Sequence, residues 1–200
     1  MMSAMETAGI EPGFRDPVFD SQHTFRCILD AFGYVGRAQV LSRANTRIGP
    51  LDPATIAVCL TLTDFETPIW LDPVADSKPV RDFLAFHCGV TVTSAEASSF
   101  AIVGNPASMP RLDQFALGTD LEPQCSTTLV IQVPAFDGGP LVRLRGPGIQ
   151  SDISLAIPSL PSWFWEDWQA NHELYPIGVD VLFTCGSSVL ALPRSVSVEV

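Results

Sequence analysis

The chain has almost no lysine. Ten of its eleven basic residues are arginines, and the single lysine, Lys78, sits in a polar stretch next to a proline. An enzyme that carries pyridoxal phosphate needs a lysine for its Schiff base, so only Lys78 could supply one. Basic residues are also outnumbered by 22 acidic ones, which gives a formal net charge of −11. This balance argues against nucleic acid or an anionic membrane surface as a partner.

Clustered cysteines and long apolar runs are absent as well. The five cysteines are scattered, without a CxxC pair or zinc-ligand spacing, so we expect no metal site and no iron–sulfur cluster. No window approaches the roughly 18 apolar residues of a membrane span. The start of the chain is acidic and polar, unlike a secretory signal, and the cysteine number is odd. Together these features predict a soluble, cytoplasmic protein.

What is present suits a globular domain. Apolar residues make up 46% of the chain and charged residues only 16%, and 200 residues fit one hydrophobic core. We expect a loose leader over residues 1–16 and a single domain over 17–200. The helical spacing of Phe19, Phe25, Ile28, Leu29 and Phe32 predicts a helix from Pro17, with Gly33 as its stop. At Asp52-Pro53, a capping acid before a first-turn proline predicts the next helix start.

Helices and strands alternate along the rest of the chain. Residues 127–133 (TTLVIQV) form the clearest strand, and a helix over 108–117 is expected to close at Gly118. Some connections look like hairpins rather than crossovers, so we predict an α/β fold with a mixed sheet and helices packed on it. The expected helices are 17–33, 53–63, 77–89, 108–117 and 158–171; the expected strands are 37–41, 67–71, 90–92, 100–103, 127–133, 141–145, 179–185, 189–192 and 196–198.

The last 26 residues carry two polar landmarks among apolar strands, Asp180 and Arg194. An arginine between a proline and a serine at a strand end is hard to explain as core. Gly146-Pro147-Gly148 follows another strand, but it matches no phosphate-loop motif and its proline removes an amide, which favours a structural turn. Arg145 shares a strand face with Arg143, which suits either an anion site or a solvated face.

Other polar residues have plain structural alternatives. His87 lies near a helix end, where the helix dipole favours it, and catalysis there would need a carboxylate partner. Asp64 and Glu66 flank a loop phenylalanine and suit a solvated loop better than a metal site. The three tryptophans of residues 158–171 fit a core or an interface equally. No GxSxG elbow is present.

A series of local patterns in fixed order resembles the PhnH family, a subunit family of the bacterial carbon–phosphorus lyase system. It covers the chain from about Gly13 to Val200. Each pattern is weak alone and the joint order is specific. The patterns are Asp20-Ser21-Gln22-His23-Thr24-Phe25-Arg26 with Asp30-Ala31, Leu60-Thr61-Leu62 with Asp64, Thr67-Pro68-Ile69-Trp70-Leu71, Phe86-His87, Gly118-Thr119 with Pro123, residues 128–133, residues 144–149, and the closing set of Pro176, Gly178, Val179, Asp180, Leu192, Pro193 and Arg194.

The resemblance implies a three-layer α/β/α fold related to pyridoxal-phosphate-dependent transferases but without that cofactor. It implies a homodimer that also joins other core subunits of the carbon–phosphorus lyase complex. At the level of the complex, a phosphonate displaces adenine from ATP to give ribose 1-phosphonate 5-triphosphate. The radical iron–sulfur chemistry of a later step belongs to another subunit.

Two hypotheses follow. In the first, the chain is a structural or assembly subunit of this complex and is not itself catalytic. In the second, it is a small-molecule or nucleotide-binding enzyme with its own site. The candidate ligand-binding residues of that site are Arg145, Gly146, Gly148, Asp180 and Arg194, and no catalytic residue is evident.

Overall fold

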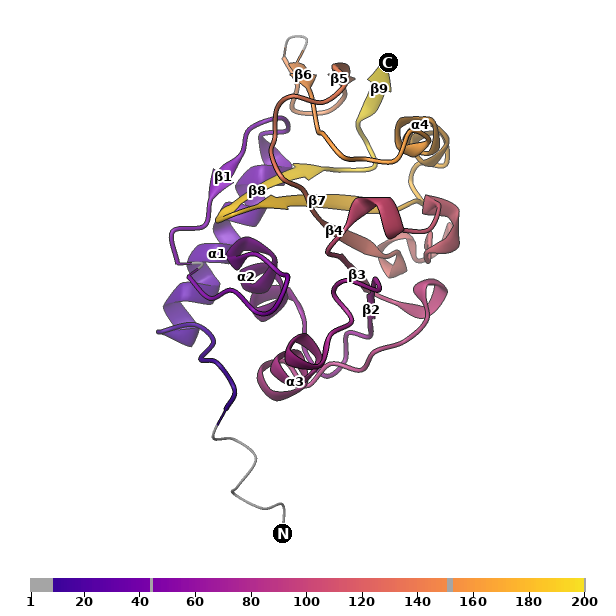
Figure 1. The fold of residues 1–200 in the computed structure, drawn as a ribbon. Helices are drawn as coiled ribbons and strands as arrows, with labels where there is room; N and C mark the ends of the chain where they lie inside the picture. The colour runs from indigo at the N-terminus through magenta and orange to yellow at the C-terminus, as the bar shows by residue number, and fades with distance from the viewer. Residues whose placement is uncertain (1–8, 44, 151–152, 200) are drawn as a thin grey trace.

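A mixed six-stranded sheet runs through the centre of the molecule (Figure 1). The computed structural model describes residues 9–43, 45–150 and 153–199. Strand order is β1-β8-β7-β4-β3-β2, with β2, β3, β4 and β7 parallel and the β8 and β1 additions antiparallel. The α/β prediction with a mixed sheet is therefore confirmed. The strands are β1 (Gln39–Val40), β2 (Ile69–Leu71), β3 (Phe100–Val103), β4 (Thr128–Gln132), β7 (Asp180–Cys185) and β8 (Ser188–Leu192).

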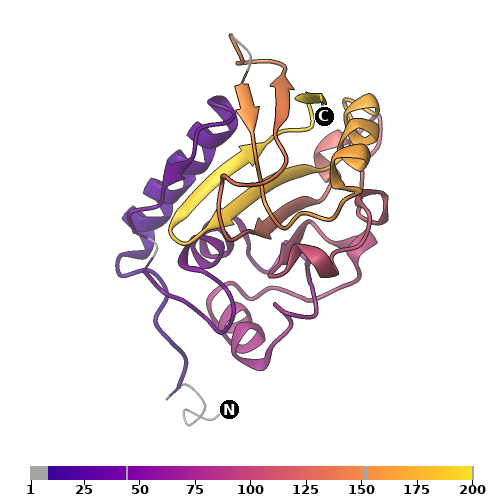
Figure 2. The same ribbon diagram turned by 45° about the horizontal axis from the view of Figure 1, so that its top comes forward.

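Three helices cover one face of this sheet, and the other face has a mixed cover. Buried residues of α1 (Pro17–Gly33), α2 (Pro53–Leu62) and α3 (Lys78–His87) share one hydrophobic cluster. On the opposite face lie α4 (Phe164–Glu173) and a three-stranded antiparallel sheet of order β6-β5-β9 (Figures 1 and 2). Its strands are β5 (Val142–Arg145), β6 (Ile153–Leu155) and β9 (Ser197–Glu199). The second outer layer is thus part helix and part sheet.

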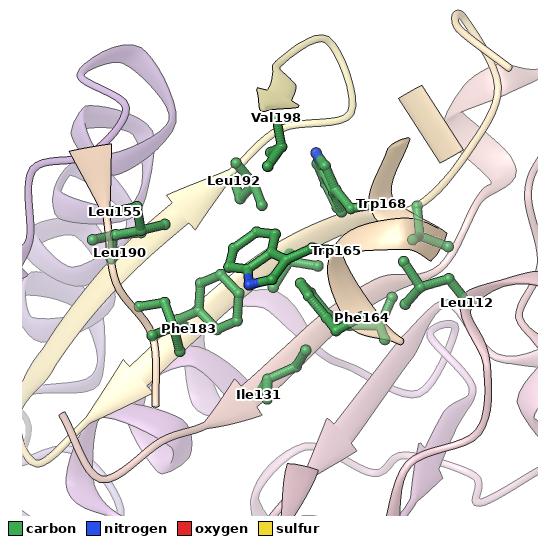
Figure 3. Packing of buried hydrophobic residues seen from close by; sticks show 14 of the residues in the cluster. Leu112, Ile131, Leu155, Phe164, Trp165, Trp168, Phe183, Leu190, Leu192 and Val198 are labelled. Atoms are coloured by element: carbon green, nitrogen blue, oxygen red, sulfur yellow. The ribbon is translucent and has the colours of Figure 1, made fainter. Parts of the chain in front are cut away.

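The central strands are buried on both faces. In β7, Val181 and Phe183 contribute to the cluster under α4, while Leu182 between them contributes to the opposite cluster. This period-two alternation is what a near-continuous apolar strand produces between two covering layers. The tryptophans of α4 complete the core on their side: Figure 3 shows Trp165 and Trp168 directed at the sheet, and both are buried. Of the two interpretations of the tryptophan-rich segment, core and interface, the core is therefore correct for Trp165 and Trp168.

Several expected elements differ. The helix expected over 108–117 is absent; the region contains only short 3-10 turns at Pro106–Ser108 and Leu112–Gln114. Met109, the residue before Pro110, is extended with φ −74° and ψ 145°, as a following proline favours, so a helix cannot run through it. Residues 90–92 contribute only an isolated bridge, Ile69 to Val92, rather than a strand. Strand β6 has no counterpart among the expected strands.

Helix α1 has an unusual distribution of side chains. The helix itself is confirmed, and Asp16 accepts a hydrogen bond from the Phe19 amide at its start. However, Phe19, Phe25 and Leu29 face solvent, so the apolar spacing locates the helix but not its buried face. The buried positions are Asp20, Thr24, Ile28 and Ala31.

The leader divides into two parts. Residues 1–8 lie outside the described residues. Residues 9–16 are attached to the body, because the Glu11 carbonyl contacts the His87 ring at 3.0 Å and the Pro12 carbonyl accepts a hydrogen bond from Thr46 at 3.2 Å. Ile10 and Phe14 pack against the helical cluster. Among the residues that the structure describes, no helix is long and apolar enough to cross a membrane.

Candidate functional site

Asp180 and Arg194 meet at the amino end of β7. Asp180 is the first residue of β7, and Arg194 follows the last residue of its antiparallel partner β8 by two positions. One carboxylate oxygen accepts the Arg194 backbone amide at 2.7 Å, and the other accepts Nε at 3.1 Å and Nη2 at 2.5 Å. The pair is mostly buried, since the two side chains are 21% and 13% exposed.

The rest of the Arg194 guanidinium is also in use. Nη1 donates to the carbonyls of Pro123 at 2.9 Å and Pro176 at 3.4 Å, and Nη2 donates to the Ser126 hydroxyl at 2.5 Å. The Arg194 carbonyl contacts Nδ1 of His172 at 2.9 Å. Every nitrogen of the guanidinium therefore has a protein acceptor, so an incoming anion would have to displace an existing bond.

The position of the Asp180–Arg194 pair in the sheet also argues against a ligand site. In open α/β sheets, ligands bind outside the carboxyl ends of the parallel strands. Asp180 lies at the opposite edge, at the amino end of β7. The arrangement ties the β7–β8 hairpin to the segments that precede β4 and β7. Its chemistry is that of a structural clamp.

Arg145 stands apart from this clamp. It lies on the exposed face of β5, and its Nη1 is 2.7 Å from a carboxylate oxygen of Glu199 on β9. Arg143 shares that face and lies 3.9 Å from the other oxygen of Glu199. Since all three side chains are about half exposed (Arg145 53%, Glu199 50%, Arg143 50%), the contacts are partly screened by solvent.

The two glycines make different contacts. A Cβ on Gly146 would lie 3.0 Å from the carbonyl oxygen of Ser195, next to the clamp in sequence, whereas one on Gly148 would lie 3.2 Å from that of Gly33 at the end of α1. Gly146 thus approaches the backbone beside Arg194, and Gly148 does not. The structure therefore separates the five sequence candidates into a clamp, a strand face and a turn.

Gly148 does border a hollow. A cavity of about 450 Å³ opens between the α1–β1 turn and the β5–β6 connection. The Arg37 guanidinium at its wall stacks over the Tyr34 ring at 5.7 Å. A polar rim with one cation and an aromatic ring could hold a small anion or a planar group. The lining residues are Tyr34, Val35, Gly36, Arg37, Gly148, Gln150 and Ile153.

Sequence reasoning missed a polar network at the carboxyl ends of β4 and β7. The Gln132 amide oxygen accepts the Asp52 backbone amide at 2.6 Å, and the Thr55 hydroxyl meets that of Thr184 at 2.7 Å. Asp52 was expected to cap α2, but its carboxylate instead accepts the Gly186 amide of the β7–β8 turn at 3.0 Å and pairs with Arg47. A glutamine at the end of an otherwise apolar strand was the available signal.

A second network surrounds buried Asp72 after β2. Its carboxylate accepts the amides of Ala75, Gly104 and Asn105 and the hydroxyl of Ser108, at 2.7 to 3.0 Å. Both networks therefore satisfy their members internally. The edge at which an α/β sheet commonly binds ligands is here closed by hydrogen bonds that stabilise loops.

The remaining candidate residues have local roles. His87 is the last residue of α3 and contacts the Phe83 ring at 4.4 Å as well as the Glu11 carbonyl. Asp64 accepts the amide of Glu66 and the hydroxyl of Thr67 within a single turn. No group of three His, Cys, Asp or Glu in the described ranges could hold a metal ion.

Four of the five thiols are not activated. Burial raises the pKa of Cys59, and nearby Cys88 adds to the effect. Burial is also the largest cause of the raised pKa of Cys27, Cys88 and Cys185. A nucleophilic cysteine needs a lowered pKa, so none of these four thiols has the character of a catalytic nucleophile.

Comparison with known proteins covers nearly the whole chain. The family model described as "Bacterial phosphonate metabolism protein (PhnH)" matches residues 12–199. The chain is 42% identical over 187 residues to the alpha-D-ribose 1-methylphosphonate 5-triphosphate synthase subunit PhnH of Rhizobium meliloti (strain 1021), covering 93% of this chain and 94% of the relative. It is 30% identical over 183 residues to the putative C-P lyase subunit protein HtxG of Stutzerimonas stutzeri, covering 89% and 85%.

Proposed function

Because the chain belongs to the PhnH family of bacterial phosphonate metabolism proteins, we propose that it is a subunit of a carbon–phosphorus lyase complex. The relative with 42% identity is named as a subunit of the synthase that makes ribose 1-methylphosphonate 5-triphosphate, and that match over 93% of the chain carries the proposal. At the level of the complex, the phosphonate oxygen would displace adenine from C1′ of ATP.

We infer that the chain contributes structure and assembly to this reaction. The Asp180–Arg194 pair, the most suggestive polar site in the sequence, is saturated by internal hydrogen bonds. The network at the carboxyl edge of the sheet is closed in the same way. ATP and phosphonate would then be bound by the assembled complex, together with the other core subunits.

The remaining parts of the proposal concern the cofactor, the related fold, the oligomeric state and the cellular location of the chain. We place the chain in the cytoplasm, as a homodimer, with a fold related to pyridoxal-phosphate-dependent transferases but with no cofactor and no iron–sulfur cluster. Its single lysine supports the absence of pyridoxal phosphate, because Nζ of Lys78 lies 2.5 Å from Asp82 within the first turns of α3 and its side chain is 84% exposed. Such a position would not shelter a Schiff base.

The second candidate function is a small-molecule or nucleotide-binding enzyme. The observation that favours it is the hollow beside Gly148, where Arg37 and Tyr34 offer a cation and a ring. That hollow is lined by neither Arg145 nor Arg194. A site for this alternative would therefore lie at the α1–β1 turn rather than at the clamp.

Genetics tests the favoured function. We expect deletion of the gene to abolish growth on methylphosphonate as sole phosphorus source, to leave growth on inorganic phosphate intact, and to be reversed by the intact gene. Growth of the deletion strain on methylphosphonate would refute the proposal.

The purified chain separates the two candidates. Incubated with ATP and methylphosphonate, with or without pyridoxal phosphate, it should release no adenine and develop no visible cofactor absorbance. Release of adenine by the chain alone, lost in Arg37→Ala but kept in Arg145→Ala, would favour the enzyme instead.

A further inference from the structure

Helix α1 presents its large apolar side chains to water. Val18, Phe25 and Leu29 are 74%, 45% and 53% exposed, and Phe19 is 68% exposed. The face turned to the sheet holds Asp20 and Thr24, both buried. A surface helix normally places its apolar side chains inward, so an outward apolar face marks a contact with another molecule.

The exposed residues form a continuous stripe. Val18, Gln22, Phe25 and Leu29 occupy positions i, i+4, i+7 and i+11, which fall on one side of a helix. Tyr34, 56% exposed, follows the helix. In Figure 2, α1 runs along the flank of the molecule with no other element over its outer side.

Strand β1 lies on another side of α1. It is the edge strand of the central sheet, it contacts α1, and its Val40 is 65% exposed. The Cys27 thiol donates to the Val40 carbonyl at 3.9 Å, and Cys27 is two residues from both Phe25 and Leu29, so β1 lies on the side of the helix away from the stripe. We call the side chains of Val18, Phe19, Phe25, Leu29 and Tyr34 the α1 face.

Two opposite charges lie on one side of the stripe. Arg26 and Asp30 are both exposed, and within the described residues neither side chain forms an ion pair. An arginine four residues before an aspartate has the less favourable orientation for pairing along one helix. Each charge is therefore available to a partner.

The stripe and the two charges are complementary to themselves. Consider two α1 helices that pack antiparallel, related by a two-fold axis at the height of residue 27. Phe25 of one copy then lies level with Leu29 of the other. Arg26 is then offset from Asp30 of the second copy by about 3 Å along the axis, within side-chain reach. The symmetry generates this ion pair twice, as an isologous interface requires.

We propose that the α1 face is the surface through which two copies of this chain associate, with the two α1 helices antiparallel. The inference refines the homodimer that forms part of the proposed function and rests on that proposal. Its own support is the outward apolar stripe and the self-complementary placement of Arg26 and Asp30.

Charge exchange on the purified full chain tests the geometry. Sedimentation equilibrium should show a dimer that dissociates on dilution. Arg26→Glu alone and Asp30→Arg alone each place like charges together at two symmetric points, so we expect the dissociation constant to rise at least tenfold. The double variant Arg26→Glu/Asp30→Arg recreates the pair in reverse and should recover most of the affinity. Asp120→Arg, an exposed charge elsewhere, is the control and should leave dimerisation unchanged.

Apolar substitutions provide an independent arm. Phe25→Ser and Leu29→Ser should weaken the dimer while lowering the thermal midpoint of a diluted, monomeric sample only slightly, because about half of each side chain is exposed in one copy. Leu121→Ser, at a residue that is 92% exposed, is the matched control. These variants stay informative even if a charge variant folds poorly.

Three results would overturn the inference: a wild-type chain that remains monomeric at high concentration, a dimer that Arg26→Glu does not weaken, or a double variant that behaves no better than the single ones. If the stripe variants bind the other core subunits less well and dimerise normally, the α1 face contacts a different subunit. The growth test on methylphosphonate tests the proposed function and not the dimer surface, since the deletion phenotype does not depend on which surface forms the dimer.

Discussion

The Arg194 guanidinium connects segments that are far apart in the sequence. It contacts Asp180 on β7, Ser126 and Pro123 before β4, and Pro176 in the turn after α4. A planar group with donors on every edge suits this task better than a single ammonium. The residue that looked most like a ligand-binding group in the sequence thus acts on the protein itself.

Removing this side chain should destabilise the fold. Arg194→Ala leaves a mostly buried carboxylate with fewer partners, and we expect the free energy of unfolding in urea to fall by about 2–4 kcal/mol. Arg194→Lys should recover only part of this loss. Arg145→Ala, which removes a half-exposed pair, should cost less than about 1 kcal/mol. An unchanged urea midpoint for Arg194→Ala would contradict the clamp.

At the scale of single residues, the sequence showed which polar side chains were unusual for their position. It did not show which residues those side chains contact. Asp180 and Arg194 stood out because they interrupt apolar strands. Their pairing depends on the β7–β8 register, which places Val181 opposite Leu192. Asp52 shows the limit of local rules, because the capping pattern was correct for the helix start while a turn distant in sequence took the carboxylate.

Among the elements, β6 closely approaches the turn between α1 and β1. Gly36 follows α1 with φ of +80°, and a Cβ there would lie 2.5 Å from Cγ2 of Ile153 on β6. Both the backbone conformation and the space therefore require glycine. This contact fixes the small sheet against the helix that carries the α1 face.

Gly36→Ala should disturb the junction measurably. We expect a loss of about 2–3 kcal/mol in the free energy of unfolding, from left-handed strain together with overpacking. Gly186→Ala is the matched control, because Gly186 has φ of +55° and nothing within 4 Å of the added Cβ, so it should lose only the strain, about 1 kcal/mol.

A double-mutant cycle separates the two causes. Adding Ile153→Ala to Gly36→Ala removes the clash, so the combined loss should be smaller than the sum of the single losses. Strictly additive losses would show that Ile153 is not the residue that excludes a side chain at position 36.

Element prediction succeeded where one periodicity dominated. The helix at 17–33 and the strand within 127–133 have clear patterns, and both are present. The buried face of α1 could not be predicted, since apolar spacing does not distinguish a core from an interface. Strand β6 is only Ile153–Leu155 and depends on pairing with β5 for its existence. Tertiary pairing of this kind leaves little local signal.

At the scale of the whole molecule, the burial of cysteine thiols makes the free energy of unfolding depend on pH. The raised pKa values of Cys27, Cys59, Cys88 and Cys185 mean that the folded state holds these thiols neutral. In the unfolded chain, a thiol ionises near its ordinary pKa of about 8.5. The stabilisation is complete below that pH and is lost as the pH rises through the folded values.

We therefore expect the free energy of unfolding to decline above about pH 8.5, and the decline to be smaller in Cys59→Ala. Titration of native protein with a thiol-specific disulfide reagent at pH 8 should modify exposed Cys125 first and buried Cys59 last, with the three partly exposed thiols between them. In guanidinium chloride, all five should react together. Rapid reaction of Cys59 in the native protein would contradict this burial.

Both sheets depend on the last twenty or so described residues. Strand β7 lies between β4 and β8 in the large sheet, and β9 pairs with β5 in the small one. While the chain is being synthesised, β4 and β5 therefore have exposed edges until residues 180–199 emerge from the ribosome. At bacterial rates of roughly 5–20 residues per second, the 54 residues from the end of β5 at Arg145 to Glu199 take about three to eleven seconds. During that time the nascent chain presents apolar strand edges, and it would benefit from a chaperone bound near the exit tunnel.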